Sequence, residues 1–299
     1  MNILIFGGTG FIGAHLSTLF SRQGHDVIIL SRRELPATLQ NAKAMTYTPA
    51  NLQEVFALQP SDYAVINLAG EPLQKGRWTE SRKDAILKSR TSLTEAIRQA
   101  ISQTENKPRV WINASAIGYY GTSLTKDFTE SAPAGDDFLA QVCRAWEDTT
   151  KEAQIHTRIV NLRIGVVLGR EGGALPKMML PYRMMIGGKI GSGEQWVSWI
   201  HIEDLSQLFL HALCHEEIKG AINGVAPTPV RMKAFSQHLA KAMHRPNWIP
   251  VPSFALRLLF GEMAMLLLEG QRVTPKVAID SGFRYRYPLL DEALQNLLS

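Results

Sequence analysis

Residues 4–13, Leu-Ile-Phe-Gly-Gly-Thr-Gly-Phe-Ile-Gly, decide the fold of this chain of 299 residues. The apolar run from Ile3 to Phe6 predicts a buried parallel strand, and the amphipathic run 14–22 predicts a helix. Between them, Gly7 permits a tight turn, Gly10 lets backbone N–H groups approach a diphosphate, and Gly13 lets the helix pack closely on the strand. An anion is favoured at the N-terminus of such a helix. The alternative is a glycine-rich turn without a ligand, but the pattern predicts a dinucleotide site at Gly7, Thr9, Gly10, Phe11, Ile12 and Gly13.

The end of the next strand indicates which dinucleotide would bind. The apolar run Asp26–Leu30 fits a second parallel strand, and Ser31, Arg32 and Arg33 follow it. At this distance of about twenty residues from the glycines, an NAD site places Asp or Glu against the ribose 2′-hydroxyl. A hydroxyl and two guanidinium groups instead suit a 2′-phosphate, which a carboxylate would repel. We therefore predict NADP(H) as the cofactor; the alternative is that both arginines are ordinary solvated charges.

The composition of the chain argues against several classes of ligand and partner. The formal net charge of +5 is mild and is not gathered in a basic tract, so nucleic acid is not an expected partner. The two cysteines, Cys143 and Cys214, fit a reducing cytosol and argue against a disulfide framework. The eight histidines lack metal-ligand spacing, so no metal is expected. A core strand begins at once without a signal-peptide pattern, and we expect a cytoplasmic protein.

The most apolar tract, Phe254–Leu268, is too short for a membrane span and carries Arg257 and Glu262. We expect a helix packed inside the protein, and no membrane partner.

Strand-like runs alternate with helical stretches, which is typical of a parallel sheet built from βαβ units. Further strands are expected at 64–68, 110–114, 158–162 and 220–225. Helices are expected at 83–102, from Asp136 or Asp137 to about residue 153, and at 205–214. The stretch 169–193 is rich in Gly and Met with little periodicity, which suggests a mobile loop or lid.

These patterns predict an α/β fold: a Rossmann-type doubly wound parallel sheet with a smaller, mainly helical C-terminal substrate lobe. The dinucleotide-binding domain would span 1–168, with 200–226 returning to it. The lobe would comprise 169–199 and 227–299, because helical patterns dominate after Val230.

Motifs along the whole chain resemble those of the extended short-chain dehydrogenase/reductases, of the NAD-dependent epimerase/dehydratase type. The resemblance is carried by Gly7-Gly8-Thr9-Gly10-Phe11-Ile12-Gly13, Asn67-Leu68-Ala69-Gly70, Ser115 to Gly121, Leu162-Arg163-Ile164-Gly165 and Trp199-Ile200-His201-Ile202-Glu203-Asp204. One branch, the epimerase-like family with a C-terminal domain of unknown function (DUF1731), is closer still. Its marks are Gly70-Glu71-Pro72, Arg77-Trp78, Ser89-Arg90, Gly118-Tyr119-Tyr120-Gly121, Gly135-Asp136-Asp137-Phe138-Leu139, Gly261-Glu262-Met263, Leu268 to Val273 and Gly282-Phe283-Arg284.

The general class works with a Ser, a Tyr and a Lys, the last two as Tyr-x-x-x-Lys on one helix face. In that pair the Lys charge lowers the phenol pKa, so that Tyr can exchange a proton near neutrality. No Tyr of this chain is followed by Lys four residues later. If Glu147 marks the usual glutamate one turn further on, Leu139 and Cys143 occupy the two positions and form an apolar stripe with Trp146.

The remaining catalytic candidates are Ser115, Tyr119 and Tyr120, which follow one expected strand. Ser115 could hydrogen-bond a substrate carbonyl or merely cap a turn. Either phenol would need a nearby cation, Arg163 or Arg90, to titrate near neutrality; the alternative is local packing at the strand end.

Cofactor contacts are also expected where the strand at 64–68 ends, because ligands of open α/β sheets bind at such ends. They are predicted at Asn67, Leu68, Ala69 and Gly70, and further at Arg163. Arg77 and Trp78, in the loop that follows, could contact an anionic or planar substrate or simply form a surface loop with a packed Trp. His201 and Asp204 are expected to lock a strand-to-helix turn rather than perform chemistry.

Two functions remain open. The first is an NADP(H)-dependent oxidoreductase, epimerase-like, acting on an unknown small-molecule substrate. The second is a non-catalytic NADPH-binding sensor or partner-binding protein, since some relatives carry a cell-division-inhibitor label. An oligomer is possible in either case.

Overall fold

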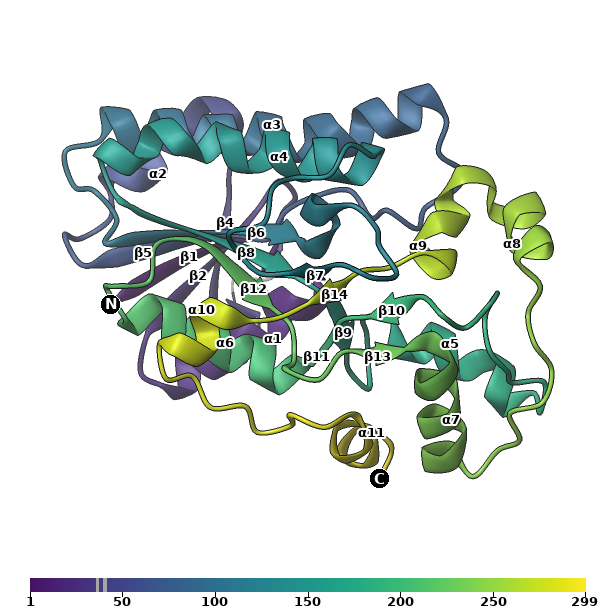
Figure 1. Cartoon of the computed structure of the whole chain (residues 1–299). Coiled ribbons are helices and arrows are strands. Elements are labelled where there is room, and N and C mark those ends of the chain that lie inside the picture. Colours follow the sequence, from purple (N-terminus) through teal and green to yellow (C-terminus); the bar gives the residue numbers. More distant parts are fainter. Residues whose placement is uncertain (36–37, 40–41) are drawn as a thin grey trace.

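The computed structural model describes residues 1–35, 38–39 and 42–299, and its centre is a twisted sheet (Figure 1). Within these residues the strand order is β12-β8-β6-β5-β1-β2-β4-β3. All neighbours pair in parallel except the edge strand β3, which is antiparallel to β4. The strands are β1 (Asn2–Phe6), β2 (Asp26–Ser31), β3 (Thr38–Leu39), β4 (Ala42–Thr46), β5 (Tyr63–Asn67), β6 (Val110–Ala116), β8 (Arg158–Ile164) and β12 (Gly220–Gly224). The predicted doubly wound parallel sheet is confirmed.

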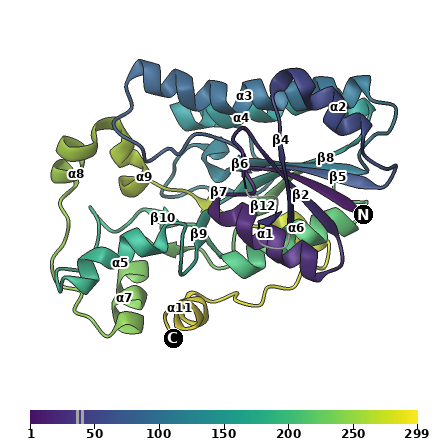
Figure 2. The same ribbon diagram turned by 180° about the vertical axis from the view of Figure 1, so that it is seen from behind.

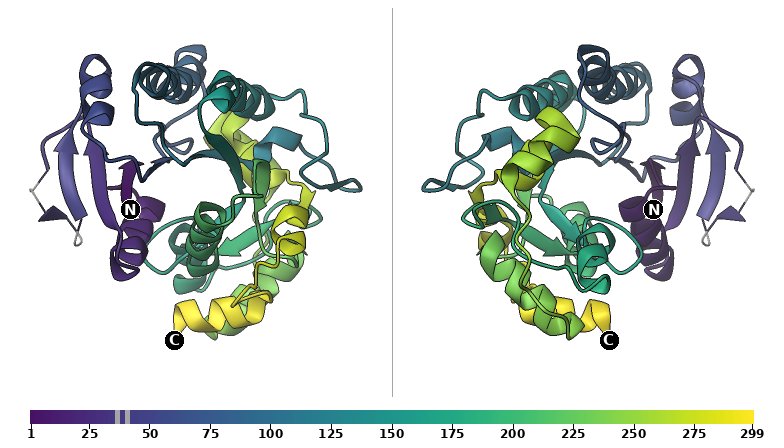
Figure 3. Two further views of the ribbon diagram at one scale, coloured as in Figure 1. Left: turned by 90° about the vertical axis from the view of Figure 1, so that its left-hand side faces the viewer. Right: turned by 90° about the vertical axis from the view of Figure 1, so that its right-hand side faces the viewer.

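Helices cover both faces of the sheet, as the edge-on views show (Figures 2 and 3). Alternate side chains of β1 serve the two layers: Ile3 and Ile5 pack in one buried cluster, whereas Leu4 and Phe6 pack in the other. One face carries α1 (Phe11–Arg22), α6 (Ile202–Cys214) and α10 (Lys276–Asp280), and the other carries α2 (Leu52–Ala57), α3 (Glu80–Gln103) and α4 (Phe138–Thr150). Short 3-10 turns lie at Pro49–Asn51, Ile117–Tyr120, Lys151–Ile155 and Gly261–Ala264.

A third buried cluster lies outside the main sheet, in the lobe. It joins α5 (Leu175–Arg183), α7 (Met232–Met243) and α11 (Leu290–Leu298). Two small sheets contribute to it: β9 (Val166–Leu168) with β11 (Trp199–His201), and β10 (Trp196–Val197) with β13 (Val230–Arg231). A further pair, β7 (Asp127–Phe128) with β14 (Arg272–Val273), packs in a separate cluster with Tyr120. The chain then returns to the main sheet, where Ala278 of α10 joins the first cluster. The domain boundaries expected from the sequence stay a prediction.

Two expectations about the lobe are wrong. The stretch 169–193 is not a plain loop, because α5 forms within it and buries Leu175, Met179 and Tyr182. The tract 254–268 is not one internal helix: α8 (Ser253–Phe260) ends at Gly261, which has φ +60°, and α9 (Met265–Leu268) follows. In α8 only Leu256 is buried, because the helix lies at the outer edge of the lobe (Figure 1).

Polar side chains fix the helix starts nearest the crevice. Asp137, rather than Asp136, caps α4 by accepting a hydrogen bond from the Ala140 N–H at 2.9 Å. His201 caps α6 through Nδ1, as expected of a residue that locks this turn. Asp204 goes further, because its carboxylate accepts the N–H groups of Arg286 and Tyr287 and so ties the C-terminal segment to α6.

Candidate functional site

The glycine-rich turn between β1 and α1 leaves backbone donors open for an anion. Gly7 has φ +79°, and α1 begins after Gly10, where no side chain caps the helix. A Cβ on Gly13 would lie 2.5 Å from the Gly7 carbonyl oxygen, so only glycine allows this approach. Thr9 and Gly10 are exposed, whereas Phe11 packs under Gly169 and Gly172. The diphosphate site at this turn stays a prediction, and the open start of α1 is compatible with it.

The segment after β5 lies directly against that turn. Asn67 is fully buried and donates to the Asn113 and Thr94 side chains at 2.9 and 3.1 Å. Its own side-chain oxygen accepts the Ala69 N–H at 3.2 Å, which fixes the backbone of 68–70. A Cβ on Gly7 would meet the Leu68 carbonyl carbon and the Ala69 nitrogen at 3.0 Å. The structure therefore brings the predicted residues 67–70 together with the glycine turn.

A cavity of about 200 Å³, here called the β2–α3 cavity, opens beside these residues. Arg32 contributes from the end of β2, and its charge opposes the burial that raises the pKa of Tyr47. Ser31 lies in the turn, where its hydroxyl accepts the Arg33 N–H at 3.1 Å. That α3 forms one wall of this cavity was not predicted from the sequence. The polar residues Lys88, Ser89 and Ser92, which helical spacing brings to one side of α3, could have indicated it. The full lining is Arg32, Tyr47, Pro49, Ala69, Gly70, Glu71, Lys88, Ser89, Ser92 and Leu93.

A buried ion pair occupies the ends of β6 and β8. Glu147 of α4 accepts the Ser115 hydroxyl at 2.6 Å and two N–H groups of Arg163 at 2.8 Å each. All three residues are less than 10% exposed. Both of these Arg163 N–H groups are already hydrogen-bonded to Glu147. The geometry of Arg163 therefore favours a structural role over the predicted cofactor contact. Ser115 likewise has its hydroxyl committed to a carboxylate.

The two candidate phenols differ in their surroundings. Tyr120 is 3% exposed, stacks on Phe128, donates to the Asn223 side chain at 2.6 Å and accepts from Arg163 at 3.0 Å. Burial raises the pKa of Tyr120 to about 12, which outweighs the opposite effect of the Arg163 charge. Of the two alternatives for Tyr120, this geometry favours local packing at the strand end, and a catalytic role stays a prediction.

Tyr119 is half-buried, with its ring on the Arg163 guanidinium at 3.4 Å. The N–H group of Gly135 donates to the Tyr119 carbonyl oxygen at 2.9 Å, which holds this segment close to the start of α4.

Apolar packing replaces the missing Tyr-x-x-x-Lys pair. Leu139 and Cys143 both lie beside Gly118, where a Cβ would meet their side chains at 3.3 and 3.9 Å. Burial raises the pKa of Cys143 to about 12, so its thiol is a core group rather than a base. Trp146 donates to the Thr94 hydroxyl at 2.9 Å and completes the stripe. The interpretation of these residues as core packing is consistent with this geometry.

The loop after β5, which carries Arg77 and Trp78, packs against α8 of the lobe. Arg77 donates to the carbonyl oxygens of Leu258 and Leu259 at the end of α8. Trp78 is 7% exposed and donates to the Leu73 carbonyl at 2.9 Å. Of the two alternatives for Arg77 and Trp78, the structure favours the packed loop.

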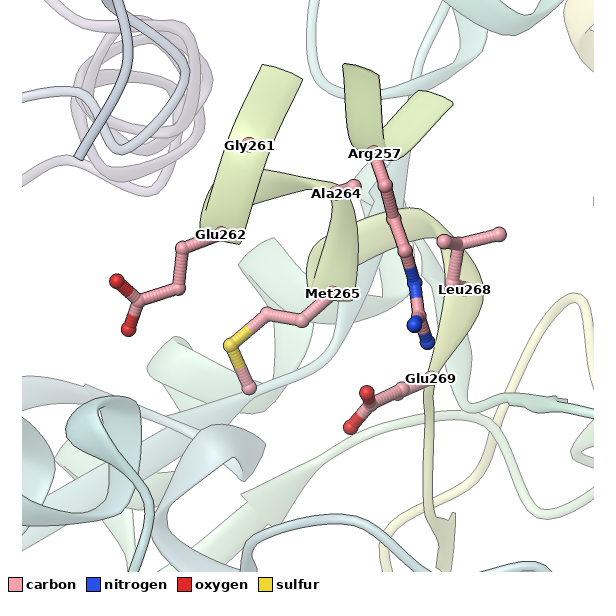
Figure 4. A pocket seen from close by; sticks show the side chains of 7 residues that line it. All are labelled: Arg257, Gly261, Glu262, Ala264, Met265, Leu268 and Glu269. Carbon is pink, nitrogen blue, oxygen red and sulfur yellow. The ribbon is translucent and has the colours of Figure 1, made fainter. Parts of the chain in front are cut away.

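A second cavity, of about 430 Å³, lies between α8 and α9 and is here called the α8–α9 cavity (Figure 4). Its lining is Arg257, Gly261, Glu262, Ala264, Met265, Leu268 and Glu269. Within residues 1–35, 38–39 and 42–299, no three His, Cys, Asp or Glu side chains gather as metal ligands would. None of the helices described is both long and apolar enough to cross a membrane.

Together, the parallel sheet, the glycine turn at the start of α1 and the cavity at the end of β2 define a dinucleotide-binding protein of the Rossmann class. The chain belongs to the NAD dependent epimerase/dehydratase family, whose profile matches residues 3–223. A domain of unknown function, DUF1731, matches residues 251–297, which confirms the resemblance seen in the tail motifs.

Relatives match along the full length. The epimerase family protein YfhF of Bacillus subtilis is 46% identical over 100% of this chain and 98% of its own. The crystal structure of human epimerase family protein SDR39U1 with NADPH is 37% identical, has a TM-score of 0.92 and covers 100% of this chain and 99% of that one. The NADP(H) prediction agrees with the cofactor in that structure. UDP-glucose 4-epimerase of Thermotoga maritima, at 16% identity and a TM-score of 0.79, shares the fold.

Proposed function

We propose that this chain is an NADPH-binding, epimerase-like oxidoreductase that acts on a small molecule held against its C-terminal lobe. The observation that carries the cofactor half of this proposal is the β2–α3 cavity, where Arg32 stands at the end of β2 and no carboxylate takes its place. Lys88, which pairs with Asp84 at 2.9 Å, adds a second cationic side chain from α3, and the one carboxylate in the lining, Glu71, is paired with Arg82 at 3.1 Å. Two cations and a serine-capped turn suit the 2′-phosphate of NADPH.

The diphosphate would lie over the glycine turn, with the N–H groups at the start of α1 as its donors. Bound there, NADPH supplies a hydride. Ala69 and Gly70, which line the β2–α3 cavity, would lie beside the bound cofactor, and Asn67 accepts the Ala69 N–H and so fixes that backbone. The NADPH found with human SDR39U1 supports this arrangement.

Proton transfer to or from the substrate cannot use a Tyr-x-x-x-Lys pair, because the chain has none. Ser115 and Tyr120 use their hydroxyls within the chain and act by holding β6, α4 and β12 together. Tyr119 is the candidate phenol that donates to no other group in the part of the chain that the structure describes. Because the ring of Tyr119 faces the Arg163 guanidinium, we propose a positioning role for it as well.

A second candidate function is a non-catalytic NADPH sensor or partner-binding protein. It is favoured by the apolar Leu139 and buried Cys143 at the positions of the usual proton-transfer pair. Both candidates require the same cofactor site, so the cofactor is tested first.

The decisive measurement is a fluorescence titration of NADPH and NADH. Arg32→Ala should weaken NADPH binding by about tenfold to a hundredfold, the value of a charge-assisted hydrogen bond, and leave NADH binding unchanged. Arg22→Ala, an exposed arginine in the last turn of α1, is the matched control and should change neither. Equal losses for both nucleotides in Arg32→Ala would contradict a 2′-phosphate contact.

Turnover separates the two functions. NADPH oxidation by a panel of carbonyl compounds should distinguish an enzyme from a sensor, and Tyr119→Phe should retain that turnover if Tyr119 only positions Arg163. Abolished turnover with intact NADPH affinity in Tyr119→Phe would instead make its phenol the proton donor.

A further inference from the structure

The outer edge of the lobe carries most of the exposed apolar side chains of the described residues. Of the fourteen large apolar side chains that are exposed there, nine lie between Leu180 and Leu259. They come from the end of α5, from the loop that joins α7 to α8, and from α8, all on the side of the lobe away from the main sheet (Figures 1 and 2). Apolar side chains gathered in this way mark an interaction surface. The nine are Leu180, Met184, Met185, Ile186, Trp248, Ile249, Phe254, Leu258 and Leu259.

Five of these residues, Met184, Met185, Ile186, Trp248 and Ile249, are here called the lobe tip. Trp248 is 67% exposed, and its indole N–H donates to the Met185 carbonyl oxygen at 2.8 Å, which joins the loop to the end of α5. Met185 has φ +62°, a left-handed conformation that residues with a side chain rarely adopt. Backbone strain of this kind is concentrated at functional sites, and here it presents exposed apolar side chains that add nothing to the core.

The backbone of residues 248–252 has no unpaired donor. The N–H groups of Trp248 and Ile249 both donate to the Gly187 carbonyl oxygen, at 3.0 and 3.1 Å, and that of Val251 is also paired, at 2.9 Å. The other two residues of this stretch are prolines, which have no N–H. This loop can therefore enter surroundings of low polarity without leaving a backbone donor unsatisfied.

The charge around the lobe tip is positive. No Asp or Glu occurs in 172–193 or in 218–261, the two stretches that contain this edge. Arg183 directly precedes Met184, and Lys241 and Arg245 come shortly before Trp248; all three cations are exposed. Two copies of this chain that met through the lobe tip would place cations against cations, which disfavours self-association. An anionic surface would instead attract the same edge.

We infer that the lobe tip binds the surface of a bilayer that contains anionic phospholipid. Trp248, Ile249 and the turn at 184–186 enter the boundary between headgroups and acyl chains, while Arg183 and Arg245 face the lipid phosphates. No membrane partner was expected from the sequence, but contact with one face of a bilayer needs no spanning helix. None of these residues lines the β2–α3 cavity, so bilayer binding and cofactor binding are independent.

The test is flotation of the full chain with two kinds of vesicle, phosphatidylcholine alone and phosphatidylcholine mixed with phosphatidylserine. The wild type should bind the mixed vesicles about tenfold or more tightly than the neutral ones, because several cations face the anionic lipid, and added salt should weaken this binding. Its tryptophan fluorescence should shift to the blue on the mixed vesicles. Trp248→Phe should still bind and should lose the shift.

Two double variants separate the apolar and the charged contributions. Met184→Gln with Ile249→Gln should weaken binding to both kinds of vesicle, by about tenfold or more, because less apolar surface enters the bilayer. Arg183→Gln with Arg245→Gln should weaken binding to the mixed vesicles alone. Leu58→Gln and Arg22→Gln, at exposed positions at the ends of α2 and α1, are the matched controls and should change neither. Unchanged thermal unfolding temperatures check that each variant folds.

Three results would overturn the assignment to a bilayer. They are no flotation of the wild type with either vesicle, equal binding to both vesicles, and double variants that bind as the controls do. Dimerisation in sedimentation velocity that Met184→Gln with Ile249→Gln abolishes, without any flotation, would assign the lobe tip to a second copy instead. The NADPH titration is a separate measurement, so failure of the proposed function and failure of bilayer binding are distinguishable.

Discussion

Replacing Glu147 by Gln tests whether the buried ion pair at the ends of β6 and β8 holds the crevice together. The carboxylate accepts three hydrogen bonds of 2.6 to 2.8 Å, one from Ser115 and two from Arg163. A glutamine keeps the shape but offers one acceptor oxygen and turns an N–H₂ group toward donors. Arg163 is 4% exposed, so its charge would stay buried without a counterion.

The expected loss follows from that geometry. Removing one partner of a buried ion pair costs about 3–5 kcal/mol of unfolding free energy, because the remaining charge stays desolvated. Glu152→Gln is the matched control: the Glu152 side chain is 75% exposed and pairs with Arg98 at 2.7 Å. An exposed pair contributes about 0–1 kcal/mol, so the control should unfold almost as the wild type does.

Urea unfolding followed by circular dichroism measures both variants. A double variant in which Glu147 and Arg163 are both Met should lose less than Glu147→Gln alone, because no charge is then left buried. The reasoning is refuted if Glu147→Gln loses no more than Glu152→Gln. The folded fraction of Glu147→Gln should still bind NADPH, since the lining of the β2–α3 cavity includes neither Glu147 nor its partners Ser115 and Arg163.

Two further predictions concern the turn and pH. Gly13→Ala should lower the thermal unfolding temperature more than Gly10→Ala, because its Cβ would lie 2.5 Å from a backbone oxygen instead of 3.3 Å; equal shifts would contradict the close packing of α1 on β1. Burial lowers the pKa of His201 below its ordinary 6.5, so the unfolded chain takes up a proton that the folded chain rejects. The unfolding free energy should therefore fall as pH drops below 6.5, by up to about 1.4 kcal/mol per pH unit, and His201→Asn should show a shallower slope in urea titrations at several pH values; equal slopes would contradict the assignment to His201.

The sequence predicted the parallel core because its signals are local. Apolar runs such as Ile3–Phe6 and the glycines that follow need no distant partner to be recognised. The strand β4, with the residues Ala-Lys-Ala-Met-Thr, has no such pattern and was not predicted. It forms because β2 offers it an edge, with Ile29 paired to Ala44.

The sequence predicted the part of the candidate site that faces the cofactor. It did not predict the contacts of the residues considered for proton transfer. Arg32, which lines the β2–α3 cavity, could be singled out because it follows the end of a strand, where ligands bind in this fold; its contact with the cofactor stays a prediction. The partner of Ser115 could not be found, because Glu147 lies on another element and meets it only in the folded chain. The prediction of an internal helix at 254–268 was wrong because an apolar run does not show which of its side chains are buried. In α8 only Leu256 is buried.

Helix α3 connects the two cavities. Lys88 and Ser89 line the β2–α3 cavity, while Lys83, near the start of the same helix, pairs with Glu262 of the α8–α9 cavity. Arg82 adds a second link, because it pairs at 3.1 Å with Glu71, which lines the β2–α3 cavity. A ligand that shifts α3 in one cavity therefore acts on the walls of the other. If such a shift occurs, linkage requires each ligand to change the affinity for the other by the same factor.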